Sequence, residues 1–309
     1  MIEFLNVGKS FGTAMAVSDL SLTIERGEFV VLIGASGSGK STALKMINRL
    51  VEHDRGQILF MGEQIRSFKA EDLRRRMGYA IQSTGLFPHW NVARNIATVP
   101  QLLGWRAPRI RARVDELLEL LGLPPHEYRG RYPHQLSGGQ QQRVGVARAL
   151  AADPELLLMD EPFGALDPIT RLSLQQEMTR IHRASGKTIV MVTHDIDEAL
   201  QLATRIVLLD RGRIVQAGTP AQLVGEPATE FVGHFLGRDG LGLRMLALDG
   251  VSSRTRAGVH TEGVPIAGTL NLRDALSEFV VRRADRLPVV DEQGRPAGTL
   301  HFSDLLRRP

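Results

Sequence analysis

Residues 34–42, GASGSGKST, have the composition of a loop that binds phosphate groups. From Gly34 to Ser41 the run matches G-x-x-x-x-G-K-[ST], in which glycines let the backbone curl so that its N–H groups point at phosphate oxygens. In this pattern Lys40 reaches the β- and γ-phosphates of a nucleotide, and the hydroxyl of Ser41 binds Mg²⁺. The sequence therefore predicts a nucleotide site, whose other members are Ala35, Ser36, Gly37, Ser38, Gly39 and Thr42.

Polar residues follow three other apolar runs. Asp160 and Glu161 close ELLLMDE, His194 follows IVMVT, and Gln82 follows YAI. Beside a phosphate loop, Asp160 would hold Mg²⁺ or its water shell, and Glu161 would orient and deprotonate the water that attacks the γ-phosphate. His194 would contact the γ-phosphate, and Gln82 would offer a carbonyl oxygen to Mg²⁺ or an amide to water. Without the phosphate loop, a structural role would be the better interpretation of each.

The phosphate loop stands between a predicted strand and a predicted helix. FVVLIG (29–34) is an apolar run of buried-strand length, and STALKMINRL (41–50) places Leu44, Ile47 and Leu50 on one helical face. Further strands are predicted at 155–161 and 187–195, a hairpin at 205–218 with its turn at Arg211–Gly212, and a helix at 109–123. Strands that alternate with helices predict an α/β domain with a largely parallel sheet, which binds ligands at the carboxyl ends of its strands.

A second run, LSGGQ (136–140), also precedes a predicted helix. The backbone N–H groups at a helix N-terminus have no intrahelical partner and attract anions. The sequence thus contains two helix starts that are suited to phosphate, far apart in the chain.

Composition excludes several classes of protein. The 309 residues suffice for one large domain and a small one. The absence of cysteine excludes disulfides and thiolate metal sites. Although the net charge is +4, only 5% of residues are aromatic and the basic residues are scattered, so we expect no nucleic-acid partner. The N-terminal residues lack the pattern of a signal peptide, and no apolar run approaches the roughly 18 residues of a transmembrane helix, which favours the cytosol.

The ordered motifs GASGSGKST, YAIQ, LSGGQ, LLLMDEP, GALD and VTHD resemble those of the nucleotide-binding subunits of ATP-binding cassette (ABC) transporters. The resemblance covers residues 1–236. It implies a P-loop NTPase of the ABC ATPase type, with a RecA-like core, a helical subdomain that carries LSGGQ, and an antiparallel β part. ATP and Mg²⁺ would be its cofactors. Ala35 and Gly164 depart from the usual proline and serine, but neither change removes a functional group, so an active ATPase is implied.

In this family two nucleotide-binding domains enclose two ATP molecules head to tail. The resemblance implies that Ser137, Gly138, Gly139 and Gln140 close over the γ-phosphate held by the other copy, which explains the second anion-binding helix start. It also implies that Phe11 stacks on adenine, that Asp167 lines the interface of a homodimer, and that Gln82 begins the loop that senses the membrane partner.

The sequence gives only indirect information about the transported solute. Residues 81–105 resemble the coupling region of importers for osmoprotectant quaternary amines such as glycine betaine and choline. This resemblance implies separate permease subunits, an extracytoplasmic solute-binding protein, and a location at the cytoplasmic face of the membrane. An ATPase of an importer for another small solute, such as an amino acid or a sugar, is the first alternative; a cassette ATPase without a transport role is the second.

The last part of the chain has a different composition. Residues 237–264 are rich in Gly, Arg and Ser and are predicted to be a linker. Residues 265–309 resemble a single cystathionine-β-synthase (CBS) motif, a small α+β tail, with a last helix capped by Ser303. Asp304 occupies the position of a ribose-binding Asp in nucleotide-binding members, but His301 stands where Thr is usual. A purely structural tail is therefore an equal alternative.

Overall fold

The computed structural model describes residues 1–81, 85–164, 166–237, 241–259 and 261–306 of the chain. They divide into two compact units, Met1–Thr219 and Pro220–Pro309. Each unit has its own cluster of buried apolar side chains. Within the described ranges, no helix is both long and apolar enough to cross a membrane.

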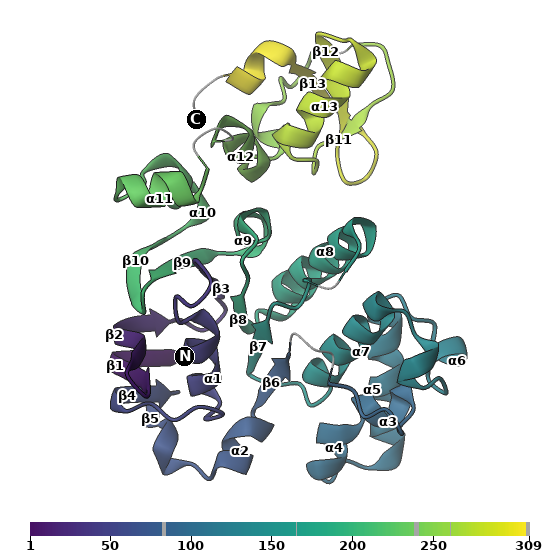
Figure 1. Ribbon diagram of the computed structural model, residues 1–309. Coiled ribbons are helices and arrows are strands. Elements are labelled where there is room, and N and C mark those ends of the chain that lie inside the picture. Colours follow the sequence, from purple (N-terminus) through teal and green to yellow (C-terminus); the bar gives the residue numbers. More distant parts are fainter. Residues whose placement is uncertain (82–84, 165, 238–240, 260, 307–309) are drawn as a thin grey trace. The chain divides into compact units, whose positions relative to one another are not determined.

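A six-stranded sheet organises the first unit (Figure 1). In spatial order its strands are β10 (Arg213–Gly218), β9 (Arg205–Asp210), β3 (Phe29–Ile33), β8 (Thr188–Val192), β7 (Leu156–Asp160) and β6 (Met77–Ala80). The strands from β9 to β6 are parallel, and β10 pairs with β9 in antiparallel orientation. Every residue of β3, β7 and β8 is buried, as expected for parallel strands covered on both faces. The predictions of a largely parallel sheet and of the hairpin are confirmed.

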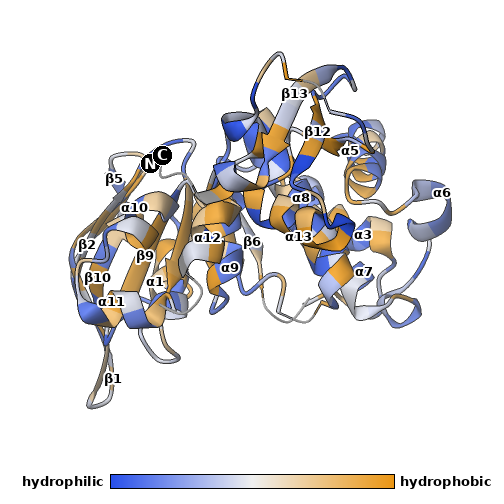
Figure 2. Cartoon of the chain, turned by 90° about the horizontal axis from the view of Figure 1, so that it is seen from above, coloured by the Kyte–Doolittle hydropathy of each residue, from blue (hydrophilic) through white to orange (hydrophobic). Residues whose placement is uncertain are grey.

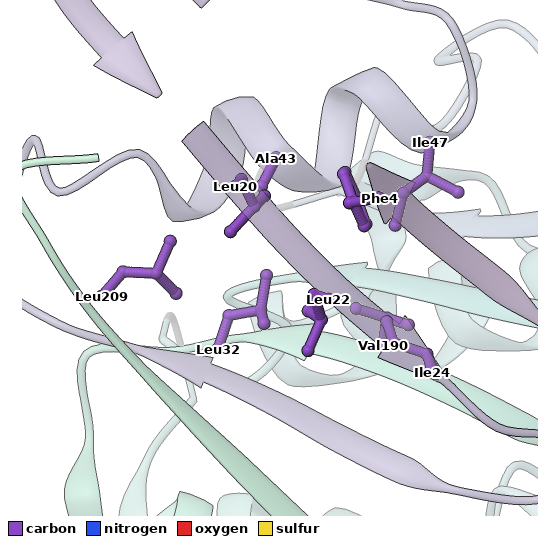
Figure 3. A pocket seen from close by; sticks show the side chains of 9 residues that line it. All are labelled: Phe4, Leu20, Leu22, Ile24, Leu32, Ala43, Ile47, Val190 and Leu209. Carbon is purple, nitrogen blue, oxygen red and sulfur yellow. The ribbon is translucent and has the colours of Figure 1, made fainter. Parts of the chain in front are cut away.

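A four-stranded antiparallel sheet forms the second layer of this unit. Its strands, in spatial order, are β2 (Ala14–Ile24), β1 (Ile2–Phe11), β4 (Arg55–Phe60) and β5 (Glu63–Gln64). Helix α1 (Lys40–Ile47) packs with both sheets, and Figure 3 shows where they meet. Side chains such as Phe4, Leu22 and Leu32 leave no space there for a water molecule. This tight packing fixes α1, and with it the phosphate loop.

The remaining helices of the first unit include a group between β6 and β7. That group contains α3 (Val92–Ile96), α4 (Thr98–Leu102), α5 (Ala107–Leu120), α6 (Pro125–Tyr128) and α7 (Gly138–Leu150), with a 3₁₀ turn at Pro133–Gln135. Outside it lie α2 (Ala70–Arg75), α8 (Pro168–Ser185), α9 (Ile196–Leu202) and a 3₁₀ turn at Ile65–Ser67. In Figure 2, α6 is largely hydrophilic, in agreement with its lack of buried residues, whereas β9 is hydrophobic. The helix predicted at 109–123 is α5.

The second unit combines a small sheet with helices. Its elements are α10 (Pro220–Gly225), α11 (Glu230–Phe235), α12 (Leu241–Leu248), a 3₁₀ turn (Val251–Arg254), β11 (Ile266–Ala267), α13 (Leu272–Arg282), β12 (Arg286–Val290), β13 (Pro296–His301) and a 3₁₀ turn (Phe302–Leu306). Strand β12 is central, parallel to β11 and antiparallel to β13. Phe279, Val289 and Leu300 lie in its core. The α+β character predicted for the tail is confirmed.

Four local expectations need correction. The segment predicted as a linker, residues 237–264, contains α12, and its Leu246 and Val251 pack into the core of the second unit. The last helix begins at Phe302, so Ser303 lies inside it and does not cap it. Leu50 lies beyond the end of α1 and is half exposed, because the helix stops at Ile47. The compact units also meet at residue 219, whereas 236 was the predicted boundary of the first domain.

Gly78 of β6 is expected to be essential for packing α7 against the sheet. A Cβ atom at this position would lie 2.3 Å from the carbonyl oxygen of Ala149. We expect Gly78→Ala to lower the free energy of unfolding by about 1–3 kcal/mol through overpacking, measured by urea denaturation. Gly130→Ala is the matched control, since a Cβ at Gly130 meets nothing within 4 Å. Equal stability of the two variants would contradict this account.

Candidate nucleotide-binding and hydrolysis site

A cavity of about 360 Å³ lies where the phosphate loop faces the ends of β7 and β8. Its lining comes from four separated parts of the sequence: Phe11, Ala16, Ser36, Gly37, Gly39, Lys40, Ser41, Thr42, Glu161 and His194. The structure thus brings together Phe11, the phosphate loop, Glu161 and His194. One apolar ring beside a loop rich in N–H groups suits a nucleotide, with a flat base and a charged phosphate chain.

The backbone of the phosphate loop requires glycine at two positions. Gly34 has a φ of 145°, and a Cβ there would lie 2.1 Å from the carbonyl oxygen of Leu209. Gly39 has a φ of 98°, and its Cβ would lie 2.4 Å from the carbonyl oxygen of Ala16. Both values lie in the left-handed region, which glycine enters without a steric penalty. The loop can therefore pass close to neighbouring strands and still open its N–H groups to the cavity.

Lys40 is held by the loop that it follows. Its Nζ donates hydrogen bonds to the carbonyl oxygens of Gly34 and Ala35, both at 2.8 Å. Burial lowers the pKa of Lys40, while the carboxylates of Glu161 and Asp160 act in the opposite direction. It also donates to Oγ of Ser38 at 3.3 Å. A buried ammonium whose direct hydrogen-bond partners are all uncharged is well placed to interact with phosphate oxygens.

Two oxygen donors from different elements meet beside Lys40. The hydroxyl of Ser41 donates to Oδ1 of Asp160 at 2.9 Å, and Asp160 is only 7% exposed. Nζ of Lys45 lies 3.8 Å from Oδ2 of the same carboxylate. Tyr79 also forms a hydrogen bond with Asp160. Burial is the main cause of the raised pKa of Tyr79, and the negative charge of Asp160 raises it further. Mg²⁺ prefers oxygen ligands and is commonly held by one or two protein groups together with phosphates and water, which fits this pair.

Glu161 and His194 face each other across the mouth of the cavity. Nδ1 of His194 lies 3.3 Å from Oε2 of Glu161. Glu161 has a φ of 47°, an unusual conformation for a residue other than glycine, and its N–H donates to the carbonyl oxygen of Val192 at 2.9 Å. Such strain typically costs about 1–3 kcal/mol and persists only where neighbouring structure enforces it. Here the bend turns the carboxylate toward the cavity.

The LSGGQ residues form a helix start, as the sequence predicts. Ser137 is the N-cap of α7: its Oγ accepts from the N–H of Gln140 at 3.3 Å, while Oε1 of Gln140 accepts from the N–H of Ser137 at 2.9 Å. Ser137 and Gly138 are exposed. None of residues 136–140 lines the cavity. Within one copy of the chain, this anion-binding helix start does not serve the phosphate loop.

Asp167 caps α8. Its Oδ1 accepts from the N–H of Thr170 at 3.0 Å. Hydrogen bonds from the side chain and backbone of Thr170 lower the pKa of Asp167, so this carboxylate stays charged. Asp167, too, is absent from the lining of the cavity. The predicted residue Gln82 lies outside the residues that the structure describes.

Sequence reasoning missed Ala16, Tyr79 and Lys45. Lys45 follows Ser41 by four residues, and helical periodicity therefore places both on the side of α1 that meets Asp160. Tyr79 precedes Gln82 in the YAIQ motif, but its contact with Asp160 depends on the pairing of β6 with β7. No local pattern indicates that pairing.

Comparison with known proteins agrees with this geometry. Residues 17–164 match the family model described as ABC transporter, and residues 259–309 match that of the CBS domain. The chain is 64% identical over 306 residues to the glycine betaine uptake system ATP-binding protein YehX of Escherichia coli, with 99% of each covered. The chain belongs to the ABC transporter family. As an ATP-binding cassette protein it binds and hydrolyses ATP, and its predicted CBS motif is confirmed.

Other relatives of this cassette support the assignment. The glycine betaine/carnitine/choline transport ATP-binding protein OpuCA of Bacillus subtilis is 48% identical over 294 residues, which cover 95% of this chain and 76% of that protein. A post-hydrolysis dimer of the cassette MJ0796, bound to ADP and Pi, has a TM-score of 0.64 and 33% identity, and covers 71% of this chain and 99% of that one. The predicted ABC ATPase fold is confirmed.

In the second unit of the chain, Asp304 forms a salt bridge with Arg256. Arg256 donates from Nε and Nη2 to the two carboxylate oxygens, at 2.8 and 2.7 Å. Asp304 is 1% exposed, whereas the side chain of Arg256 is 38% exposed. Such a two-bond pair occupies both oxygens of the carboxylate. The pair is consistent with the structural alternative for the tail.

Removal of the Lys40 ammonium should weaken nucleotide binding directly. We expect Lys40→Met to bind a non-hydrolysable ATP analogue about 10- to 100-fold more weakly, because one charged hydrogen bond typically contributes 1.5–3 kcal/mol. Titration calorimetry measures the affinity. Lys69→Met, which removes an exposed ammonium outside the cavity, is the control. Unchanged affinity in Lys40→Met would rule out the assignment of the phosphate loop.

Proposed function

We propose that this chain is the ATP-hydrolysing subunit of an importer for a quaternary amine osmoprotectant, such as glycine betaine or choline. The observation that carries this proposal is the 64% identity, over almost the whole of both chains, to a glycine betaine uptake ATP-binding protein. The relative from Bacillus subtilis, named for glycine betaine, carnitine and choline, supports the same class of cargo. An importer of another small solute remains the alternative.

In the proposed mechanism, two copies of the chain bind ATP between them. Phe11 stacks on the adenine, and the N–H groups of the phosphate loop, together with Lys40, hold the phosphates. Ser137 and Gly138 at the start of α7 then close over the γ-phosphate bound by the other copy. The exposure of these two residues, and their absence from the cavity of their own chain, support this arrangement.

Glu161 acts as the general base of hydrolysis in this mechanism. It takes a proton from the attacking water, and His194 contacts the γ-phosphate and holds the Glu161 carboxylate in place. Ser41 and Asp160 would hold Mg²⁺, which neutralises phosphate charge in the transition state. Closure of the two copies with ATP bound, and their separation after hydrolysis, would drive the conformational change of the permease.

The permease would dock on residues 87–94. Phe87 and Arg94 are exposed and Trp90 is half-buried; the ring centroids of Phe87 and Trp90 lie 4.4 Å apart, and Arg94 stacks on Trp90 at 4.3 Å. Asn95, fully buried, donates to the carbonyl oxygens of Phe87 and Trp90 and fixes the loop. Through the permease, the chain would lie at the cytoplasmic face of the membrane and work with a solute-binding protein.

Replacement of the general base should separate binding from turnover. We expect Glu161→Gln to bind ATP with normal affinity but to hydrolyse it about 10²- to 10⁴-fold more slowly, measured by phosphate release. The amide keeps the shape of the side chain and removes its basicity. Glu155→Gln, at the surface before β7, should hydrolyse ATP at the normal rate. Rapid hydrolysis by Glu161→Gln would exclude Glu161 as the base.

Glu161→Gln also offers a test of the transport role. We expect this variant, tagged and isolated with ATP from the membranes of its own cells, to bring a permease and a solute-binding protein with it. A second replacement, Trp90→Ala, should abolish recovery of the permease without loss of ATP binding. Uptake assays with glycine betaine and choline then identify the cargo. Recovery of ribosomes or DNA instead would refute a transport role.

A further inference from the structure

The first turn of α8 carries a residue, Arg171, that contacts two other parts of the catalytic unit. Nη2 of Arg171 donates to the carbonyl oxygen of Leu166 at 3.2 Å, just before the capping residue Asp167. Nη1 lies 3.7 Å from Oδ2 of Asp195, and Nε lies 3.9 Å from Oε1 of Glu198. The planar guanidinium therefore joins the loop before α8 to the N-terminal turn of α9.

Glu198 is an unusual partner because it is almost completely buried. Its side chain is 6% exposed, and burial raises its pKa. Oε2 of Glu198 accepts a hydrogen bond of 2.7 Å from the hydroxyl of Thr193, which itself accepts from the N–H of Asp195 at 3.0 Å. Buried carboxylates are seldom retained without a partner. Here the hydrogen-bond partner is Thr193, the residue before His194, and Arg171 supplies a nearby positive charge.

The same turn of α8 also supports the LSGGQ helix. A Cβ atom on Gly139 would lie 2.9 Å from Cγ2 of Thr170, so the backbone of Gly139 packs closely against the side chain of Thr170. Thr170 also hydrogen-bonds Asp167 through its N–H. The start of α8 is thus packed against the residues that face the other copy in the proposed dimer, while Arg171 extends from it to the loop that carries His194.

We propose that Arg171 is a positioning residue that couples the Leu166–Asp167 loop to the His194 loop. When the second copy presses on Asp167, the bond from Arg171 to the Leu166 carbonyl passes that displacement to Asp195 and Glu198. Thr193 is hydrogen-bonded to Glu198 and directly precedes His194, so its position determines where the His194 side chain lies relative to Glu161. Arg171 touches neither nucleotide nor water in this scheme. The inference rests on the proposed roles of Glu161 and His194 in hydrolysis.

The test compares variants of the full-length chain in ATP hydrolysis. We expect Arg171→Gln to lower kcat at least about tenfold, because small misplacements of catalytic groups are costly, with KM for ATP changed less than about twofold. Arg171→Lys keeps the charge but lacks the fork of donors, so it should recover only part of kcat. Arg180→Gln is the control, since Arg180 lies on the same helix in an exposed pair with Glu177; it should retain wild-type kcat.

A double-mutant cycle distinguishes coupling from general damage. Glu198→Gln is close in shape to the native residue and keeps an acceptor for Thr193. We expect Arg171→Gln and Glu198→Gln combined to lose no more activity than the more impaired single variant. Losses that multiply, or an Arg171→Gln kcat equal to that of Arg180→Gln, would overturn the proposal. If Arg171→Gln does not fold, Arg171→Lys and Glu198→Gln decide the question in the same cycle.

The Glu161→Gln measurement separates this proposal from the one on which it depends. If Glu161→Gln hydrolyses ATP rapidly, the proposed general base is wrong, whatever Arg171 does. If Glu161→Gln is inactive and Arg171→Gln is normal, only the coupling is wrong. Binding of a non-hydrolysable ATP analogue to Arg171→Gln should match wild type, because Arg171 does not line the cavity.

Discussion

The parallel register of β3, β7 and β8 is the constraint on which the site depends. Leu32 of β3 and Asp160 of β7 both pair with Val192 of β8. Because parallel strands end at the same edge of a sheet, this shared register determines the point at which each of the three strands ends. The phosphate loop, Glu161 and His194 follow within a few residues of these strand ends. The phosphate loop and the ends of β7 and β8, which lie more than a hundred residues apart in sequence, therefore line one cavity.

That edge concentrates charge that the protein itself balances. Lys40 and Lys45 lie beside Asp160, and both lysines come from α1, the helix that the two sheets hold in place. Burial makes each of these interactions stronger than it would be in water, and it makes a missing partner costly. ATP enters a site in which positive and negative groups are already fixed. Little reorganisation is then needed when charge develops on the phosphates.

The sequence predicted those parts of the fold that local patterns encode. Apolar runs located β3, β7 and β8, and the glycine spacing located the phosphate loop with the helix after it. Helix α12 was not predicted, because it is short and glycines near its ends are typical of a linker. It packs against α10 and α13, which are separate from it in sequence. The contacts of Tyr79 and Arg171 could not be predicted either. These contacts join elements that are brought together by the order of strands in the sheet and by helix packing. The spacing of residues in the sequence does not indicate either.

The Arg256–Asp304 pair has an evolutionary consequence. Because Asp304 is buried and Arg256 donates to both of its oxygens, loss of the arginine alone leaves a desolvated charge, whereas loss of the aspartate alone leaves a partly exposed guanidinium that water can solvate. Only the first of these steps passes through a strongly destabilised intermediate. Lineages that abandon the pair should therefore replace Asp304 before Arg256. The order of replacement at these two positions would record that history.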